Sequence, residues 1–497
     1  MNHRTIKANV LFSVLFQIVS IGCGFIIPRV LLATFGSETN GLISSISQFL
    51  NYVTLLEGGV TGVATAALYK PLRENDTERI NDVVNAIRRY FNRLGLLCLG
   101  FTVAVAVVYP RVVATHYSYL YTFILTIVLG SRLIIQYCVS ISYRLLLNAD
   151  QKVYYVSIVY IIITIVHLVL VLACVRFTDD VLLVYFVSGL VYLIQPLFYI
   201  LYVNKHYELD GKTEYKGNVL AQKWDGFGQN LAYFIHTNTD VVLLTLFSTL
   251  TNISIYAIYL LVANALKGFI ITVSSALVPS IGNILVDEDI VKSNYYFEKY
   301  EFAIVLISFL FYTCGIELIV PFVSVYTKGV SDADYIQPIF GTILLMAEMV
   351  CCIRDPYVSV AYASGHFKQT SKYAYTEAIG NIVISILLVR NLGLVGVAIG
   401  TLVSMSIRAI QQALYLKDNI LYRNPITFFK KVFIYGGVSF AIVSISRAFI
   451  PNRMESFIEW FFYAITAFVL TSLAYSIVNA IFYKKDYWSF VARVIKR

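Results

Sequence analysis

The sequence predicts an all-α, polytopic membrane protein of about fourteen transmembrane helices, with two six-helix bundles in a parallel pseudo-symmetric repeat plus two C-terminal helices. Composition is the first observation: of 497 residues, 58% are apolar and only 13% are charged, and the mean hydropathy is +0.73. In a typical soluble domain about a quarter of the residues are charged. The composition therefore excludes an ordinary soluble enzyme, and ten Pro and 27 Gly exclude collagen-like or low-complexity sequence.

Fourteen apolar windows are the second observation, because a helix needs roughly 20 mostly apolar residues to cross a bilayer. Their approximate limits are 9–34, 40–68, 84–109, 119–146, 153–175, 181–203, 226–249, 253–279, 300–324, 335–361, 371–390, 394–416, 431–450 and 456–483. The strands of a membrane β-barrel would instead show short segments of alternating hydrophobicity. The first window is too long for a signal peptide and no small-residue cleavage site follows it, so we expect it to be kept as a first span.

Basic residues set the expected orientation. With the N-terminus in the cytoplasm, 27 of the 38 Lys and Arg fall in cytoplasmic segments, against six in outer segments and five within spans. Cytoplasmic segments of membrane proteins carry such an excess. We therefore place both termini in the cytoplasm and attribute the net charge of +9 to this asymmetry rather than to a nucleic-acid partner.

Motifs for catalysis or cofactor binding are missing from the sequence. None of the seven Cys forms a CxxC pair or has a ligand-like spacing to a His, so we expect neither a disulfide framework nor a metal site. Gly211-Lys212-Thr213 looks like the end of a P-loop, but position 206 is His rather than Gly and no strand precedes it. Because the longest loop, about 204–225, has no room for a domain, we expect no enzyme activity and no cofactor.

Internal repetition is the third observation. The first and seventh windows lie about 216 positions apart, and the fourth and tenth end in the similar segments 146–152 and 361–368. Six spans per repeat give both halves one orientation, as in alternating-access transporters whose site lies between the halves. The expected domains are an N-terminal bundle at 1–205, a cytoplasmic linker at 206–225, a C-terminal bundle at 226–417, and two further helices with a basic tail at 418–497.

Charged residues inside the spans carry the functional argument. We single out ten: Arg29, Arg132, Lys267, Arg354, Arg408, Glu57, Asp240, Glu348, Asp355 and Glu377. Ten such residues facing lipid would cost on the order of 30 kcal/mol, more than the usual net stability of a fold. They must therefore pair, face a watery cavity or lie near span ends.

Helical spacing indicates where some of these side chains point. Arg132, Gln136, Ser140 and Tyr143 would form one polar stripe on the fourth span, and Glu348 and Asp355 would share a face of the tenth. Asn230, Tyr233, Thr237 and Asp240 would share a face of the seventh span, with His236 one turn from Asp240. We also expect a kink at Pro28, next to Arg29.

Five basic residues are candidate substrate-binding residues: Arg29, Arg132, Lys267, Arg354 and Arg408. Arg binds phosphate in a bidentate manner and Lys contributes a point charge, so the set suits a phosphate or pyrophosphate in a cationic cavity. The alternative is that these charges neutralise acidic residues on other helices, or that Arg408 reaches the inner interface. Asp240 and Glu57 are candidate ion-coupling residues, for H⁺ or Na⁺, with a role as counter-ions as the alternative.

Short motifs over nearly the whole chain resemble the polysaccharide exporters, the bacterial repeat-unit flippases of the multidrug/oligosaccharidyl-lipid/polysaccharide superfamily. They are Pro28-Arg29 with Phe35-Gly36, the stretch 55–59 with its acidic Glu57, and Thr239-Asp240 followed by Tyr256 and Pro279-Ser280. Fourteen spans also suit this family, because the superfamily's drug exporters usually have twelve.

The resemblance implies a flippase of the bacterial cytoplasmic membrane, which moves an undecaprenyl-diphosphate-linked oligosaccharide from the inner to the outer leaflet for surface polysaccharide synthesis. It also implies that Arg29, Arg132 and Lys267 face the diphosphate. The main alternative is a cation-coupled multidrug antiporter, which would depend on Asp240 or Glu57. An integral-membrane glycosyltransferase would commonly need a large outer loop, and a scaffold without transport would not need the buried charges.

Overall fold

The computed structural model describes residues 3–57, 60–113, 115–210, 227–286, 289–484 and 487–488, and within these residues the regular structure is entirely helical. The chain divides into two compact units, residues 1–234 and 235–497. In the described part, eleven helices are long and apolar enough to cross a membrane. The predicted all-α class is confirmed, and each of the fourteen windows falls on one helix or on consecutive helical segments.

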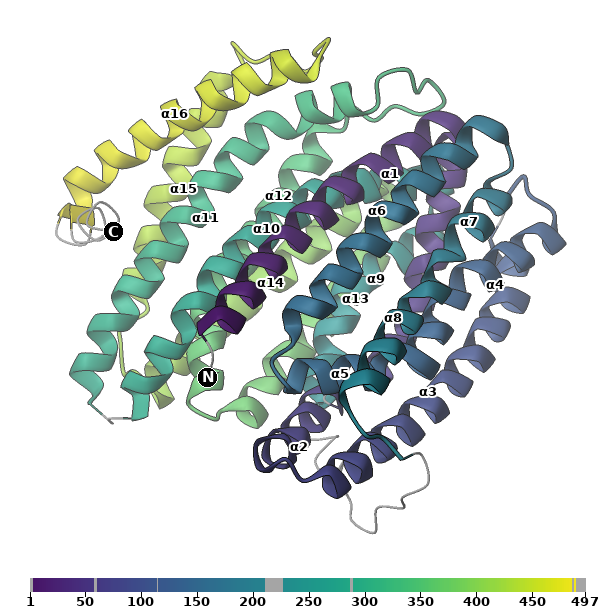
Figure 1. The fold of residues 1–497 in the computed structure, drawn as a ribbon. Helices are drawn as coiled ribbons and strands as arrows, with labels where there is room; N and C mark the ends of the chain where they lie inside the picture. Colours follow the sequence, from purple (N-terminus) through teal and green to yellow (C-terminus); the bar gives the residue numbers. More distant parts are fainter. Residues whose placement is uncertain are drawn as a thin grey trace. The chain divides into compact units, whose positions relative to one another are not determined.

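The first unit contains the helices of the first six windows (Figure 1). Their bounds are α1 His3–Asn51, a 3₁₀ segment at Tyr52–Glu57, α2 Val60–Glu74, α3 Thr77–Val112, α4 Tyr119–Ile135, a π-helical turn at Gln136–Ser140, α5 Ile141–Ala149, α6 Val153–Phe177, α7 Val181–Gly189 and α8 Val191–His206. α9 (Phe227–Phe247) contains the boundary between the units.

The break in the first helix lies at Gly36 rather than at Pro28. The backbone keeps helical dihedral angles through Pro28 and leaves them at Gly36, where φ is 80°. Glycine has no Cβ and adopts this left-handed value without a steric clash. α1 therefore covers the first predicted window and the beginning of the second, and α2 completes the second.

The second unit contains the longest uninterrupted helices. Their bounds are α10 Leu250–Val286, α11 Ile290–Tyr326, α12 Pro338–Ala363, α13 Phe367–Leu392, α14 Leu394–Asn419, α15 Ile426–Ser446 and α16 Phe457–Phe482. α13 and α14 form a tight antiparallel hairpin around Gly393, where φ is 53°. α15 and α16, which have no counterpart in the first six windows, pack on α11 (Figure 1).

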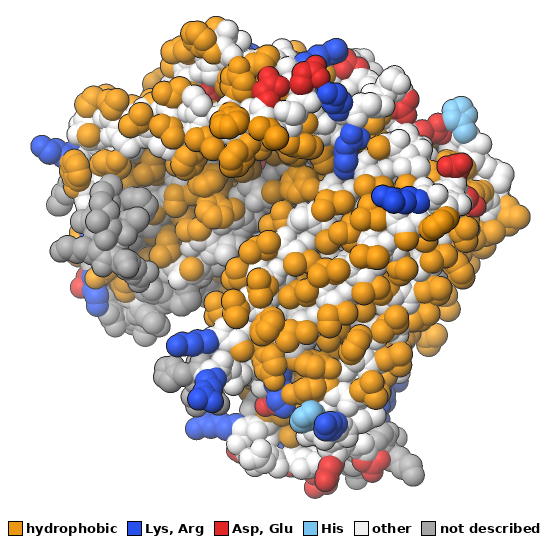
Figure 2. Space-filling model, turned by 45° about the horizontal axis from the view of Figure 1, so that its top comes forward, with side chains coloured by type: hydrophobic (Ala, Val, Ile, Leu, Met, Phe, Trp, Pro, Cys, Tyr) orange, Lys and Arg blue, Asp and Glu red, His pale blue; other side chains and the backbone are white. Residues whose placement is uncertain are grey.

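Hydroxyl groups join these last two helices to α11. Thr313 Oγ1 of α11 lies 2.8 Å from Ser439 Oγ of α15 and 3.0 Å from Tyr475 OH of α16, and the last two oxygens are 2.6 Å apart. Polar side chains inside a membrane bundle find partners on neighbouring helices, because lipid offers none. On the face drawn in Figure 2, apolar side chains cover wide areas along the helices, as expected of surfaces in contact with lipid.

Candidate functional site

Two polar contacts join α10 to α12 in the second unit. Lys267 Nζ lies 2.9 Å from Glu348 Oε2, and Ser274 donates a hydrogen bond to Asp355. Lys267 and Ser274 are seven residues apart on α10, as Glu348 and Asp355 are on α12, so each helix presents one face to the other. The prediction that Glu348 and Asp355 share a face is confirmed.

A buried carboxylate on α13 holds two arginines. Arg354 Nη1 of α12 donates a 2.7 Å hydrogen bond to Glu377 Oε1, and Arg408 Nη1 of α14 donates to Glu377 Oε2. Glu377 is fully buried, and both arginine side chains are almost fully buried. The Arg408 side chain is therefore buried among the helices of this unit. Together these three groups carry a net charge of +1.

Each of these arginines has one N–H donor that makes no hydrogen bond to the described residues. Arg354 Nε and Arg408 Nε are buried and have no hydrogen-bond partner there. A buried donor without a partner costs about 1–3 kcal/mol, more when it is charged. Two guanidinium N–H groups of this kind, next to a net positive charge, suit an anion with several acceptor oxygens.

Asp240 of α9 lies in a cluster of oxygen atoms. Tyr256 OH donates to Asp240 Oδ2 at 2.8 Å, and Thr401 Oγ1 lies 2.9 Å from the same oxygen and 3.1 Å from the Val397 carbonyl oxygen. Asn381 Nδ2 donates to Thr401 Oγ1 at 2.8 Å. Asp240 and Tyr256, which the family resemblance singles out, are therefore in direct contact.

Two oxygens of this cluster have no hydrogen-bond partner in the described residues: Asp240 Oδ1 and Asn381 Oδ1. Both residues are buried, and no Lys or Arg among the described residues pairs with Asp240. A hard cation is bound by carboxylate, amide, hydroxyl and carbonyl oxygens of this kind. The cluster is therefore a candidate site for a small monovalent cation or for a proton on Asp240.

The first unit holds the other basic candidates. The Arg132 guanidinium lies 4.3 Å from the centre of the Tyr192 ring of α8, a cation–π contact, and the side chain is otherwise exposed. Arg29 of α1 is half-buried.

The predicted polar stripe on the fourth span is interrupted by the π-helical turn at Gln136–Ser140, because the wider turn shifts the later residues around the helix axis. Tyr143 accordingly accepts a hydrogen bond from Arg88 of α3, at 2.6 Å.

Glu57 is held by groups of the same unit. Tyr137 OH donates to Glu57 Oε2 at 3.1 Å, Thr61 Oγ1 donates to Oε1 at 3.0 Å, and Arg144 Nη2 lies 3.6 Å from Oε1. Both carboxylate oxygens therefore have partners, in contrast to Asp240.

Two acidic residues escaped the sequence analysis, although both lie in the window 300–324. Glu301 is fully buried on α11 and pairs with Arg423 and with Lys431 of α15. Glu317, on the same helix, lies among apolar residues next to α15 and α16. For Glu317 the signal was present in the sequence, since a Glu in the middle of an apolar span is as informative as Glu57 or Glu348, whereas Glu301 lies at the start of the window.

Several sequence-level candidates lie outside the described residues. They are Gly58-Gly59, segment 211–226 with Gly211-Lys212-Thr213 and most of the expected linker, and the side chains of Asn230, Tyr233, His236, Thr237 and Pro279-Ser280. Among the residues that are described, no group of three or more His, Cys, Asp or Glu is arranged to hold a metal ion.

These features define a multi-pass α-helical membrane protein. The fold is similar to that of the lipid II flippase MurJ in an inward closed conformation, with a TM-score of 0.72 and 17% identity over 96% of this chain and 99% of that one. The fold is also similar to that of an inward-facing multidrug resistance MATE family transporter of the MOP superfamily. The TM-score is 0.61 and the identity 12%, over 80% of this chain and 95% of that one. For the MATE multidrug transporter DinF-BH the TM-score is 0.59 and the identity 12%, over 85% of this chain and 97% of that one. No protein-family model and no curated protein matches the chain.

Proposed function

We propose that this protein is a flippase that moves an undecaprenyl-diphosphate-linked oligosaccharide from the inner to the outer leaflet of the bacterial cytoplasmic membrane, for surface polysaccharide synthesis. It acts by alternating access, without a chemical conversion and without a cofactor. Both termini lie in the cytoplasm. The similarity to MurJ supports a flippase, because it extends over 96% of this chain, against 80% and 85% for the two MATE transporters.

The observation that carries the proposal is the Arg354–Glu377–Arg408 cluster. Its net charge is positive, it is buried among α12, α13 and α14, and its two buried Nε donors lack partners in the described residues. A diphosphate carries negative charge and many acceptor oxygens, and Arg binds such groups in a bidentate manner. Lys267 adds a further positive charge on α10, with Glu348 as its counter-ion.

Arg29 and Arg132 are the proposed diphosphate contacts of the first unit. Arg132 is exposed and has only the Tyr192 ring as a described partner, so its donors remain available to a ligand. Asp240 is the proposed ion-coupling residue. Glu57 is the second candidate for this role, although Tyr137, Thr61 and Arg144 already surround its carboxylate.

Complementation tests the proposal. Deletion of the gene should reduce surface polysaccharide and trap lipid-linked oligosaccharide in the inner leaflet, and the wild-type gene should reverse both effects. Arg132→Ala and Lys267→Ala should fail to reverse them at normal protein level, whereas Arg453→Ala, in the exposed connection before α16, should behave as wild type. Unchanged polysaccharide without a trapped intermediate would reject the flippase.

A cation-coupled multidrug antiporter is the second candidate, and the Asp240 cluster favours it. An acidic residue with one unpaired carboxylate oxygen and no basic partner in the described part can bind H⁺ or Na⁺ whatever the exported substrate is. This candidate predicts drug efflux in a sensitive host, which Asp240→Asn abolishes and Arg132→Ala leaves intact. Failure of efflux together with trapped oligosaccharide would reject it.

A further inference from the structure

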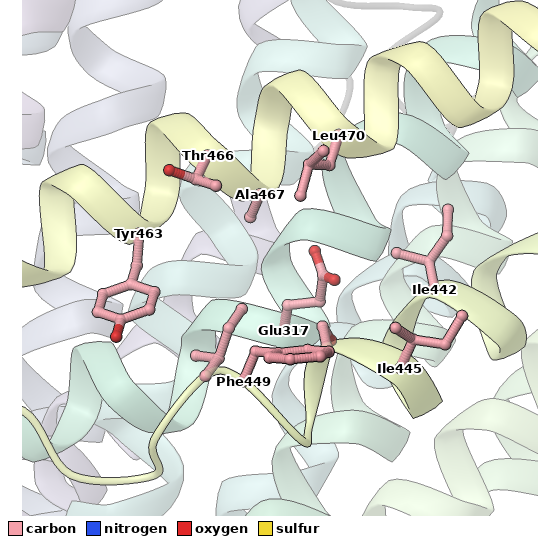
Figure 3. Close-up of a pocket in the computed structure, with 10 residues that line it drawn as sticks. Glu317, Ile442, Ile445, Phe449, Tyr463, Thr466, Ala467 and Leu470 are labelled. Carbon is pink, nitrogen blue, oxygen red and sulfur yellow. The ribbon is translucent and has the colours of Figure 1, made fainter.

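A cavity of about 310 Å³ lies among α11, α15 and α16 (Figure 3). This volume has room for roughly ten water-sized groups. Its walls are mostly apolar, and the residues are Glu317, Ile442, Ile445, Ser446, Phe449, Ile450, Tyr463, Thr466, Ala467 and Leu470. These helices are distinct from those that hold Asp240, Lys267 and the two buried arginines, so the cavity is a separate feature of the second unit.

The carboxylate of Glu317 points from α11 into this cavity, between α15 and α16 (Figure 3). Glu317 is only 9% exposed. Its polar neighbours are neutral hydroxyls: Thr471 Oγ1 donates a long hydrogen bond of 3.5 Å, and the Ser446 hydroxyl lies beside it. No Lys, Arg or His of the described residues lies within ion-pair distance of it. Glu301, Glu348 and Glu377, by contrast, each have a basic partner.

A lone carboxyl group in an apolar cavity either keeps its proton or, when ionised, needs a positive group beside it. Transfer of an unpaired charge from water to an apolar environment is so costly that buried charges are normally paired. The walls also include two aromatic residues, Phe449 and Tyr463, a residue type whose ring attracts cations. The site therefore combines an anionic anchor with aromatic and aliphatic surfaces.

The cavity borders the apolar outer surface of the helices. Three of its lining residues, Ile445, Phe449 and Leu470, are 65%, 75% and 60% exposed. Ile445 lies on α15 and Leu470 on α16, where such exposed apolar side chains face lipid, whereas Phe449 lies in the connection between the two helices. A ligand that enters past them must therefore dissolve in the bilayer.

We infer that this cavity binds a lipid-soluble organic ammonium ion, with the cationic nitrogen at Glu317 and the apolar body between α15 and α16. A ligand without a positive charge would fill the apolar space but would not stabilise the ionised form of the Glu317 carboxyl group. The inference does not depend on the proposed flippase activity, because it concerns other helices and a direct binding measurement tests it.

Trp460 provides the probe for that measurement. Its Nε1 donates a 3.2 Å hydrogen bond to the carbonyl oxygen of Leu318, the residue after Glu317. With Trp224 and Trp488 replaced by Phe, the fluorescence of Trp460 is followed in lipid nanodiscs during titration with 4-phenylbutylammonium and, in parallel, with the neutral 4-phenylbutanol. We expect the ammonium ion to bind at least tenfold more tightly than the alcohol.

Three variants locate the binding. Glu317→Gln should weaken ammonium binding at least tenfold and leave the alcohol unaffected, whereas Glu455→Gln, which changes an exposed carboxylate before α16, should alter neither. Thr466→Phe fills the cavity without touching the carboxylate and should weaken both ligands. Gel filtration confirms that each variant is folded. Equal affinity for the two ligands, unchanged ammonium binding in Glu317→Gln, or binding that does not saturate would each overturn the inference.

Discussion

Arg354 on α12 and Glu377 on α13 form a buried ion pair in which Arg354 Nη1 lies 2.7 Å from Glu377 Oε1. Arg408 on α14 contacts the other carboxylate oxygen, so one side chain connects three helices. Removal of one partner from a buried pair leaves an uncompensated charge, which costs more than the pair contributes. The cluster can therefore determine both the stability of this unit and its affinity for an anion.

Glu377→Gln should destabilise the protein strongly, because two buried guanidinium groups lose their shared counter-ion. The expected loss is about 3–5 kcal/mol of unfolding free energy, measured as a lower midpoint of thermal unfolding in detergent. Glu298→Gln on α11, which changes a half-exposed carboxylate, should change the midpoint little. Addition of pyrophosphate should stabilise the wild type if the cluster binds anions. A Glu377→Gln protein as stable as the wild type would show that the arginines do not depend on this carboxylate.

Na⁺ should stabilise the wild-type protein through Asp240 if the coupling ion is Na⁺. A ligand that binds only the folded state at one hundred times its Kd adds about 2.7 kcal/mol, so the unfolding midpoint in NaCl should exceed that in choline chloride. Asp240→Asn should abolish the difference, because the amide lacks the charge. Glu57→Gln should keep it, since the carboxylate of Glu57 already has partners on both oxygens. Equal midpoints of the wild type in the two salts would favour a proton on Asp240.

The helical architecture could be predicted from the sequence because hydropathy and length alone determine which segments cross a bilayer. Positions along single helices could also be predicted, as the shared face of Glu348 and Asp355 shows. The break at Gly36 and the π-helical turn at Gln136–Ser140 could not, since both depend on local backbone geometry that hydropathy does not report.

The partners of the buried charged residues could not be predicted from the sequence, for a different reason. Arg354 and Glu377 are 23 residues apart, and Lys267 and Glu348 come from helices separated by α11. Which helices neighbour each other decides these pairs, and spacing along one helix carries no such information. Glu317 is the opposite case. Its place in an apolar span can be read from the sequence, and only the structure shows that no basic residue of the described part pairs with it.

A charge swap can separate the structural role of Lys267 from its proposed role in binding. Glu348→Gln should destabilise the protein, because it removes the counter-ion of Lys267 at 2.9 Å. Lys267→Glu combined with Glu348→Lys should restore most of the thermal stability, since an ion pair forms again between α10 and α12. Polysaccharide export should nevertheless stay impaired if a positive charge is needed on α10 itself. Full export by the swapped protein would show that Lys267 serves only to pair with Glu348.

Gly396→Ala should destabilise the α13–α14 hairpin. A Cβ at Gly396 would lie 2.6 Å from the backbone carbonyl carbon and oxygen of Leu388, and a backbone group cannot rotate away as a side chain can. Overpacking of this kind costs about 1–3 kcal/mol, measured as a lower unfolding midpoint in detergent. Gly436→Ala on α15 is the matched control, because no atom lies within 4 Å of its added Cβ. There the change should stabilise the helix by up to about 1 kcal/mol, as alanine favours the helical backbone. If the two variants shifted the midpoint in the same direction, the close approach of α13 and α14 at Gly396 would be refuted.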